Sequence, residues 1–91
     1  MACLISGNRT GLLEVPTVLR VGPYRFFFFS NEGREPPHIH VKVGEDEAKF
    51  WLDPVALASN YGFNARELNE VEHLVDQHRD DFLEAWHEHL G

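Results

Sequence analysis

The chain has 91 residues, of which 43% are hydrophobic and 25% are charged, and its formal net charge is −7. This composition is typical of one globular domain rather than of a disordered or fibrous protein, and the negative charge argues against nucleic-acid binding through long-range attraction. The lone cysteine, Cys3, excludes an internal disulfide, and no apolar run approaches the roughly 20 residues of a membrane-spanning helix, so we expect a cytoplasmic protein.

The N-terminal residues 1–14 show neither helical nor strand periodicity and contain several turn-forming residues. We expect them to form a flexible N-terminal extension outside a single α+β domain that spans residues 15–91.

Residues 17–21 and 24–30 are rich in β-branched and aromatic residues and are separated by Gly22-Pro23, a pattern that predicts a β-hairpin. In this hairpin Leu19 lies opposite Phe26. Side chains alternate between a core face and a second face, which we call the outer face. The outer face then carries Val18, Arg20, Arg25, Phe27 and Phe29.

The next two strands are expected at residues 38–43 and 48–53, with Gly44 to Glu47 as the turn. The register that gathers all their apolar residues on the core face pairs Val43 with Ala48 and Ile39 with Leu52. On the outer face this register pairs His38 with Asp53, His40 with Trp51, and Lys42 with Lys49. The simplest topology is a four-stranded antiparallel meander.

In the last third of the chain, apolar residues recur at the spacing of an α-helix. Asp53-Pro54 predicts the start of a short helix over 55–58, and Asn64 with Glu67 resembles a capping box for a long helix over 65–90. Apolar residues at three-and-four spacing should pack this long helix on the core face, and Arg79-Asp80-Asp81 is where it could bend or split.

The outer face of this sheet interleaves aromatic and basic side chains, although the chain is acidic overall. Residues 1–43 carry five basic and three acidic side chains, whereas residues 44–91 carry three basic and twelve acidic ones. An exposed apolar patch on this face favours a contact with a partner protein or with a second copy of the chain, and RNA is the alternative ligand. The expected binding residues are Arg20, Arg25, Phe27, Phe29, Lys42, Lys49 and Trp51.

The two histidines of this face allow a catalytic hypothesis. His38 with Asp53 would form a base oriented by a carboxylate and His40 the acid, the roles that metal-independent RNA cleavage requires. The simpler interpretation is a structural hydrogen bond between His38 and Asp53. His38 and His40 could alternatively share a metal ion, but we expect no cofactor.

Residues 15–91 resemble a bacterial family, domain of unknown function family 4160. The resemblance rests on Pro16-Thr17-Val18-Leu19-Arg20, Tyr24-Arg25-Phe26-Phe27-Phe28, Glu35-Pro36-Pro37-His38-Ile39-His40-Val41, Glu47-Ala48-Lys49-Phe50-Trp51-Leu52 and Leu83-Glu84-Ala85-Trp86. It implies a small cytosolic protein that is often encoded beside a member of domain of unknown function family 2442, an arrangement similar to a toxin–antitoxin pair. It implies no reaction or catalytic residue. We therefore expect an interaction module of a two-protein system, with the ribonuclease and the metal-binding protein as alternatives.

Overall fold

The computed structural model describes residues 17–29 and 33–90. The predicted N-terminal extension, residues 1–14, lies outside the described residues.

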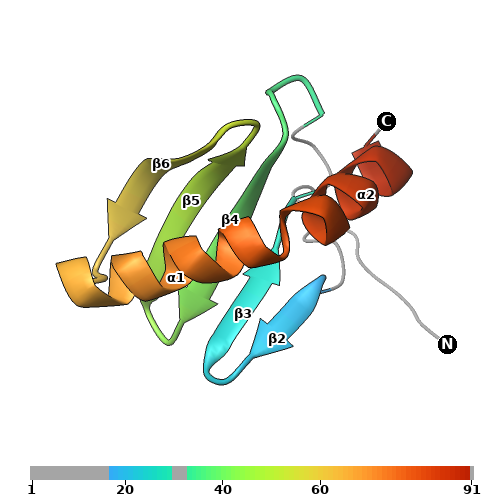
Figure 1. The fold of residues 1–91 in the computed structure, drawn as a ribbon. Coiled ribbons are helices and arrows are strands. Elements are labelled where there is room, and N and C mark those ends of the chain that lie inside the picture. The colour runs from blue at the N-terminus through green and yellow to red at the C-terminus, as the bar shows by residue number, and fades with distance from the viewer. Residues whose placement is uncertain (1–16, 30–32, 91) are drawn as a thin grey trace, which may run out of the picture.

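The chain folds into one antiparallel sheet followed by two helices, an α+β arrangement (Figure 1). Among the described residues the sheet has five strands in sequential order, so the predicted meander topology is confirmed, whereas the predicted count of four strands is one too few. The elements are β2 (Leu19–Val21), β3 (Tyr24–Phe27), β4 (His38–Val43), β5 (Asp46–Leu52), β6 (Val55–Tyr61), α1 (Ala65–Gln77) and α2 (Arg79–Leu90).

The first hairpin has the predicted register, with Leu19 opposite Phe26. The second hairpin does not, because Val43 pairs with Asp46 and Ile39 with Phe50. The turn contains only Gly44 and Glu45, and Gly44 has a φ of 60° that favours glycine. The predicted register is thus wrong by two residues. A shift of two keeps every side chain on its predicted face, so hydrophobic alternation alone does not exclude it.

Residues 55–58 form part of β6 and not the predicted short helix. Asp53-Pro54 makes the turn of a hairpin, so that Val55 pairs with Leu52 and Leu57 with Phe50. A single helical turn would leave most of its own backbone groups and the edge of β5 without partners, whereas strand pairing provides hydrogen bonds for both segments.

The predicted long helix is divided at its expected weak point into α1 and α2. The capping box at Asn64 and Glu67 is present, and α1 ends at Gln77, followed by the C-cap residue His78, whose φ and ψ of −105° and 16° leave the helical region. The break lets α2 change direction and follow the end of the sheet (Figure 1). Arg79 secures its start by donating from Nε to the carbonyl oxygen of Leu52, at 2.7 Å.

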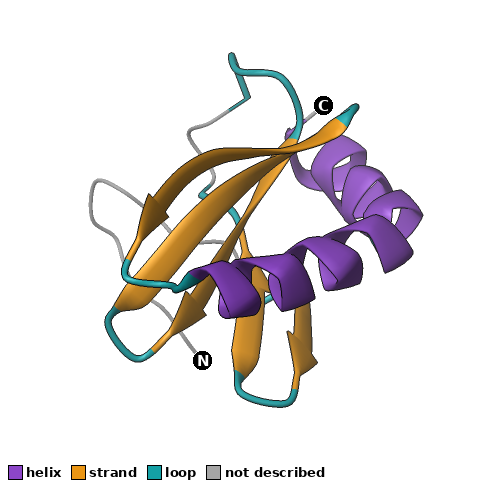
Figure 2. Cartoon of the chain, turned by 60° about the vertical axis from the view of Figure 1, so that its left-hand side comes forward, coloured by secondary structure: helices purple, strands orange, loops and turns teal. Residues whose placement is uncertain are grey.

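Both helices cover the same face of the sheet, as Figure 2 shows, so the core lies between this face and the helices. Phe82 of α2 packs on Phe26 with ring centroids 5.2 Å apart, and Trp86 packs on Phe28 at 5.5 Å. The other buried core residues are Tyr24, Ile39, Val41, Ala48, Phe50, Leu52, Phe63, Val71 and Val75.

Candidate functional site

The outer face of the sheet, opposite the helices, carries a row of cations. Arg20 pairs with Arg25 across β2 and β3, and Arg25 pairs with Lys42 across β3 and β4. Glu47 and Tyr61 continue the same row on β5 and β6. We call Arg20, Arg25 and Lys42 the basic row. Arg20 is exposed, and Arg25 and Lys42 are half-buried.

Beside the basic row lies a packed group of rings on the same face. We call Phe27, Phe29, His38, His40 and Trp51 the histidine–aromatic cluster. His40 stacks on Phe27 with centroids 5.4 Å apart and meets Phe29 edge-on at 5.0 Å. Phe27 is only 1% exposed, and Phe29 and Trp51 are half-buried. The expectation of an exposed apolar patch here is therefore wrong for Phe27.

His38 is fully buried at the end of the sheet where α2 passes. Its ring lies 4.8 Å from the ring of Trp86 and 5.7 Å from that of Trp51. Its Nδ1 is 2.9 Å from the carbonyl oxygen of Pro36. A carbonyl only accepts, so Nδ1 carries a proton, and Nε2 is the ring nitrogen whose lone pair could serve as a base.

The predicted pairing of His38 with Asp53 is wrong, because the register places Trp51 opposite His38. Asp53 instead accepts from a terminal nitrogen of Arg79 at 2.9 Å, and its side chain is 70% exposed. The carboxylate that does approach His38 is Glu35, whose Oε1 lies 3.8 Å from Nδ1. The same oxygen accepts from Nζ of Lys49 at 2.5 Å.

The predicted pairs of His40 with Trp51 and of Lys42 with Lys49 are also replaced. His40 pairs with Lys49, and Lys42 pairs with Glu47. Nδ1 of His40 lies 3.6 Å from Oε2 of Glu47, close enough for an ion pair when the ring is protonated. Glu47 therefore places an anion directly beside Lys42, at one end of the basic row.

Two of the predicted binding residues, Arg25 and Lys49, lie over aromatic rings of the outer face. Arg25 lies over the ring of Phe27, with its guanidinium carbon 4.6 Å from the centroid, and donates from Nε to Thr17 at 2.9 Å. Lys49 lies over the ring of Trp51, also at 4.6 Å. These contacts hold the side chains of Arg25 and Lys49 against aromatic rings of the outer face.

The geometry of the outer face bears on the predicted catalytic and metal-binding roles of its histidines. The lone-pair atom of His38, Nε2, is itself buried, whereas a general base must reach the proton that it abstracts. Among the residues that the structure describes, no three His, Cys, Asp or Glu side chains come together as a metal site. The outer face is better suited to binding an anionic group on the basic row.

Two residues of this face, Glu35 and Glu47, were missed at the sequence level. Glu47 alternates with Lys49 and Trp51, so strand periodicity could have identified it once β5 was extended to Asp46. Glu35 precedes a proline pair in a turn, and its contact with Lys49 depends on the fold of that turn.

On the core side, Tyr24 forms a partly buried polar contact with α1. Its hydroxyl donates to Oε1 of Glu70 at 2.6 Å. This hydrogen bond to Glu70, together with burial, raises the pKa of Tyr24 to about 12. The contact secures α1 to the first hairpin.

The sequence of residues 24–87 matches a family described as "Domain of unknown function (DUF4160)". The chain belongs to the DUF4160 family. The match covers β3 to α2, and so includes Arg25 and Lys42 of the basic row and the whole of β4. No curated protein and no solved structure shows a significant match to this DUF4160 chain. Neither of the helices in the described part of this DUF4160 protein is long and apolar enough to cross a bilayer.

Proposed function

We propose that this protein is an interaction module that binds an acidic surface of a small partner protein through the basic row. The observation that carries the proposal is the alignment of Arg20, Arg25 and Lys42 as direct cross-strand partners on three neighbouring strands. Among the described residues no helix covers this face of the sheet (Figure 2).

Within the row the neighbouring cations repel one another, and Glu47 opposite Lys42 offsets part of this repulsion. Like charges directly opposite each other on neighbouring strands destabilise a sheet by several tenths of a kcal/mol. The three cations span about 10 Å, twice the spacing of neighbouring strands. An anionic surface of that width would meet all three cations at once, and we infer that the row makes such a contact.

An acidic protein suits the row better than RNA. The chain carries a net charge of −7, and Glu47 follows the basic row on the next strand. Both features repel the extended phosphate backbone of a nucleic acid, whereas a compact acidic patch can contact three cations and avoid Glu47.

Two candidates could supply the acidic surface. One is the small protein of domain of unknown function family 2442 that the family resemblance suggests, with which this chain would form a toxin–antitoxin-like pair. The other is a second copy of the chain, whose residues 44–91 carry twelve acidic side chains. We favour the family 2442 protein. If a second copy placed its helical surface on the sheet face of another copy, the contact would be head-to-tail and would not close into a dimer.

The test is calorimetric titration of the full chain with a small protein of domain of unknown function family 2442. We expect the double substitution Arg20→Ala with Lys42→Ala to weaken binding about ten-fold, since each lost charge pair contributes roughly 0.7 kcal/mol. The matched control removes two other exposed cations, with Arg34→Ala and Arg66→Ala. Arg25 is left in place because it contacts Thr17 and Phe27.

Equal weakening in both double variants would contradict the proposal, because binding would then follow net charge alone. A parallel titration with a single-stranded RNA oligonucleotide distinguishes the alternative ligand. Saturable RNA binding that depends on Arg20 and Lys42, without binding of the protein partner, would replace the proposed partner with RNA.

A further inference from the structure

Within residues 17–29 and 33–90, the strand β6 forms one edge of the sheet, because β5 alone pairs with it there. Its sequence from Val55 to Tyr61 contains no charged residue and no proline, the features that commonly protect an edge strand from pairing with another chain. Leu57 is 45% exposed. The pairing with β5 shifts between Leu57 and Ser59, so the regular part of this edge is Val55 to Leu57.

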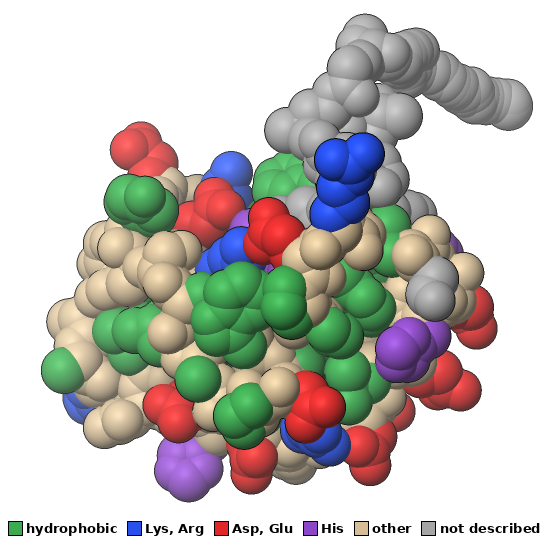
Figure 3. All heavy atoms as spheres, turned by 90° about the horizontal axis from the view of Figure 1, so that it is seen from above, with side chains coloured by type: hydrophobic (Ala, Val, Ile, Leu, Met, Phe, Trp, Pro, Cys, Tyr) green, Lys and Arg blue, Asp and Glu red, His purple; other side chains and the backbone are tan. Residues whose placement is uncertain are grey.

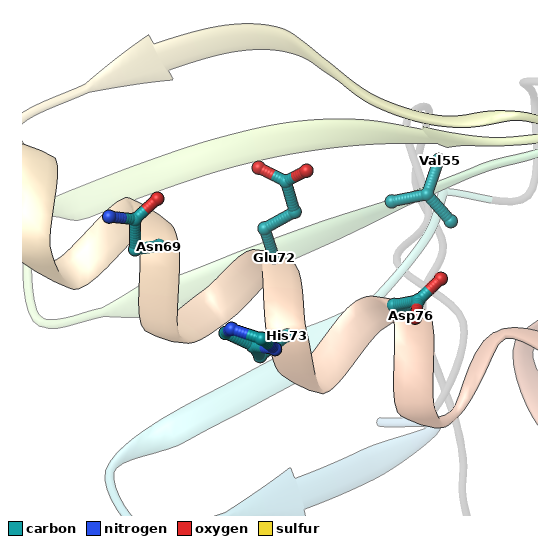
Figure 4. A pocket seen from close by; sticks show the side chains of 5 residues that line it. All are labelled: Val55, Asn69, Glu72, His73 and Asp76. Atoms are coloured by element: carbon teal, nitrogen blue, oxygen red, sulfur yellow. The ribbon is translucent and has the colours of Figure 1, made fainter.

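A cleft of about 360 Å³ lies between this edge and α1. Val55 lines it from the strand, and Asn69, Glu72, His73 and Asp76 line it from the helix. Figure 4 shows the carboxylates of Glu72 and Asp76 directed from α1 toward the sheet, on the side where Val55 lies. Figure 3 shows acidic side chains beside hydrophobic ones on one side of the molecule, with Lys and Arg side chains among them.

Glu72 and Asp76 lie one helical turn apart. Neither makes an ion pair or a hydrogen bond with its side chain within residues 17–29 and 33–90. Two like charges at this spacing destabilise a helix by a few tenths of a kcal/mol. A ligand cation beside each carboxylate would remove this repulsion.

The spacing of the two carboxylates also matches an extended chain. Four residues of helix rise about 6 Å, and alternate residues of a strand are about 6.6 Å apart. A segment that paired with Val55 to Leu57 would direct every second side chain toward the helix side of the sheet. Side chains at positions i and i+2 of that segment would therefore reach Glu72 and Asp76 in turn.

We propose that the edge of β6 and the cleft beside it bind an extended segment of a partner protein that carries lysine or arginine at alternate positions. Backbone hydrogen bonds to β6 supply the strand pairing, and the two carboxylates select the cations. A second copy of the chain is a poorer occupant, since symmetric pairing of two β6 edges would bring the acidic α1 helices of both copies together. The site lies on the helix side of the sheet and is independent of the basic row.

The test measures fluorescence anisotropy of three labelled peptides with blocked ends: Lys-Val-Lys-Val-Lys, Lys-Pro-Lys-Pro-Lys and Glu-Val-Glu-Val-Glu. The first should bind the full chain saturably. The second has the same charge but lacks two N–H donors, and should bind at least about five-fold more weakly. The third should not bind.

The test also includes two matched charge variants. Glu72→Gln with Asp76→Asn should weaken binding of the first peptide about five-fold. The control, Glu84→Gln with Glu88→Gln, removes two exposed carboxylates at the same spacing on α2 and should leave binding unchanged. The Arg20→Ala with Lys42→Ala variant should also bind this peptide normally, which separates this site from the proposed function.

Four results would overturn the proposal. They are the absence of saturable binding to the first peptide, equal binding of the proline peptide, equal weakening by the α2 control pair, and self-association of the free chain that Leu57→Lys abolishes. The last result would make a second copy the occupant. Circular dichroism of each variant confirms that the fold is retained before binding is compared.

Discussion

Replacement of His38 by alanine tests whether this histidine supports the fold. The ring is fully buried and contacts Trp51 and Trp86 at centroid distances of 5.7 and 4.8 Å. Its Nδ1 donates to the carbonyl oxygen of Pro36. The alanine variant would lose the ring contacts between the sheet and α2 and would also lose this hydrogen bond.

The expected magnitude follows from these two losses. Truncation of a buried ring leaves a cavity and costs about 2–3 kcal/mol, and loss of the hydrogen bond costs about 1 kcal/mol more. A 91-residue domain has a free energy of unfolding of roughly 5–14 kcal/mol, so a loss of about 3–4 kcal/mol is a large fraction of the total.

Two further variants separate the contributions. His38→Asn keeps a nitrogen donor at the same number of bonds from the backbone but loses the ring, and should lose about 2–3 kcal/mol. His38→Phe keeps a ring of similar size but loses the donor, and should lose about 1–2 kcal/mol. The order of stability should be wild type, His38→Phe, His38→Asn, His38→Ala.

The assay is equilibrium unfolding in urea, followed by far-ultraviolet circular dichroism and by tryptophan fluorescence. The exposed His87 of α2 provides the control, since His87→Ala should change the free energy of unfolding by less than about 0.5 kcal/mol. A loss below 0.5 kcal/mol for His38→Ala as well would refute the structural role and return His38 to the candidates for catalysis.

Three further predictions concern other contacts. Glu70→Gln should lower the pKa of Tyr24 from about 12 toward 10, measured by absorbance at 295 nm after the other tyrosine is replaced by phenylalanine. Because the pKa of Tyr24 is raised in the folded state, this contact stabilises the fold fully below pH 10, and its contribution is lost as the pH rises to 12. The free energies of unfolding of wild type and Glu70→Gln should therefore converge near pH 12. A difference that stays constant with pH would contradict the assignment. Arg79→Ala should lower the free energy of unfolding by about 1–2 kcal/mol in urea, because the carbonyl of Leu52 loses a charged donor, and an unchanged value would show that α2 docks without it. Gly62→Ala should cost at least about 1 kcal/mol in thermal unfolding, since Gly62 has a φ of 108° and an added Cβ would overlap a carboxylate, and a variant as stable as wild type would contradict this backbone conformation.

The first hairpin shows what local sequence can predict. A two-residue turn at Gly22-Pro23 and alternating apolar residues determine the pairing of Leu19 with Phe26, and the structure has this pairing. The second hairpin has more than one compatible turn. Registers that differ by two residues keep Ile39 and Val41 on the core face, so only the turn at Gly44 distinguishes them.

The strand β6 was missed because its local signals favour a helix. Asp53-Pro54 is a good helix start, and alanine and leucine are strong helix formers. Pairing with β5 overrides these preferences, since β5 has an edge that β6 can cover. Such pairing is a property of the whole sheet, and propensities within a short window do not report it.

The candidate site was predicted in outline only. Strand periodicity places Arg20, Arg25, Lys42 and both histidines on the outer face, as the structure does. It does not report how deeply each side chain is buried. The burial of His38 and Phe27 and the pairing of Asp53 with Arg79 depend on α2 and on turns that come together only in the folded chain.

The central claim, that the basic row binds an acidic partner, is tested most directly by mapping the contact. Backbone amide nitrogen–proton spectra of the isotope-labelled full chain would be recorded during titration with a small protein of domain of unknown function family 2442, the proposed partner. We predict that the largest shifts occur at Arg20, Arg25 and Lys42 and at their neighbours on β2 to β4, with little change in the helices. Shifts confined to α1 and α2, with an unchanged outer face, would contradict the claim.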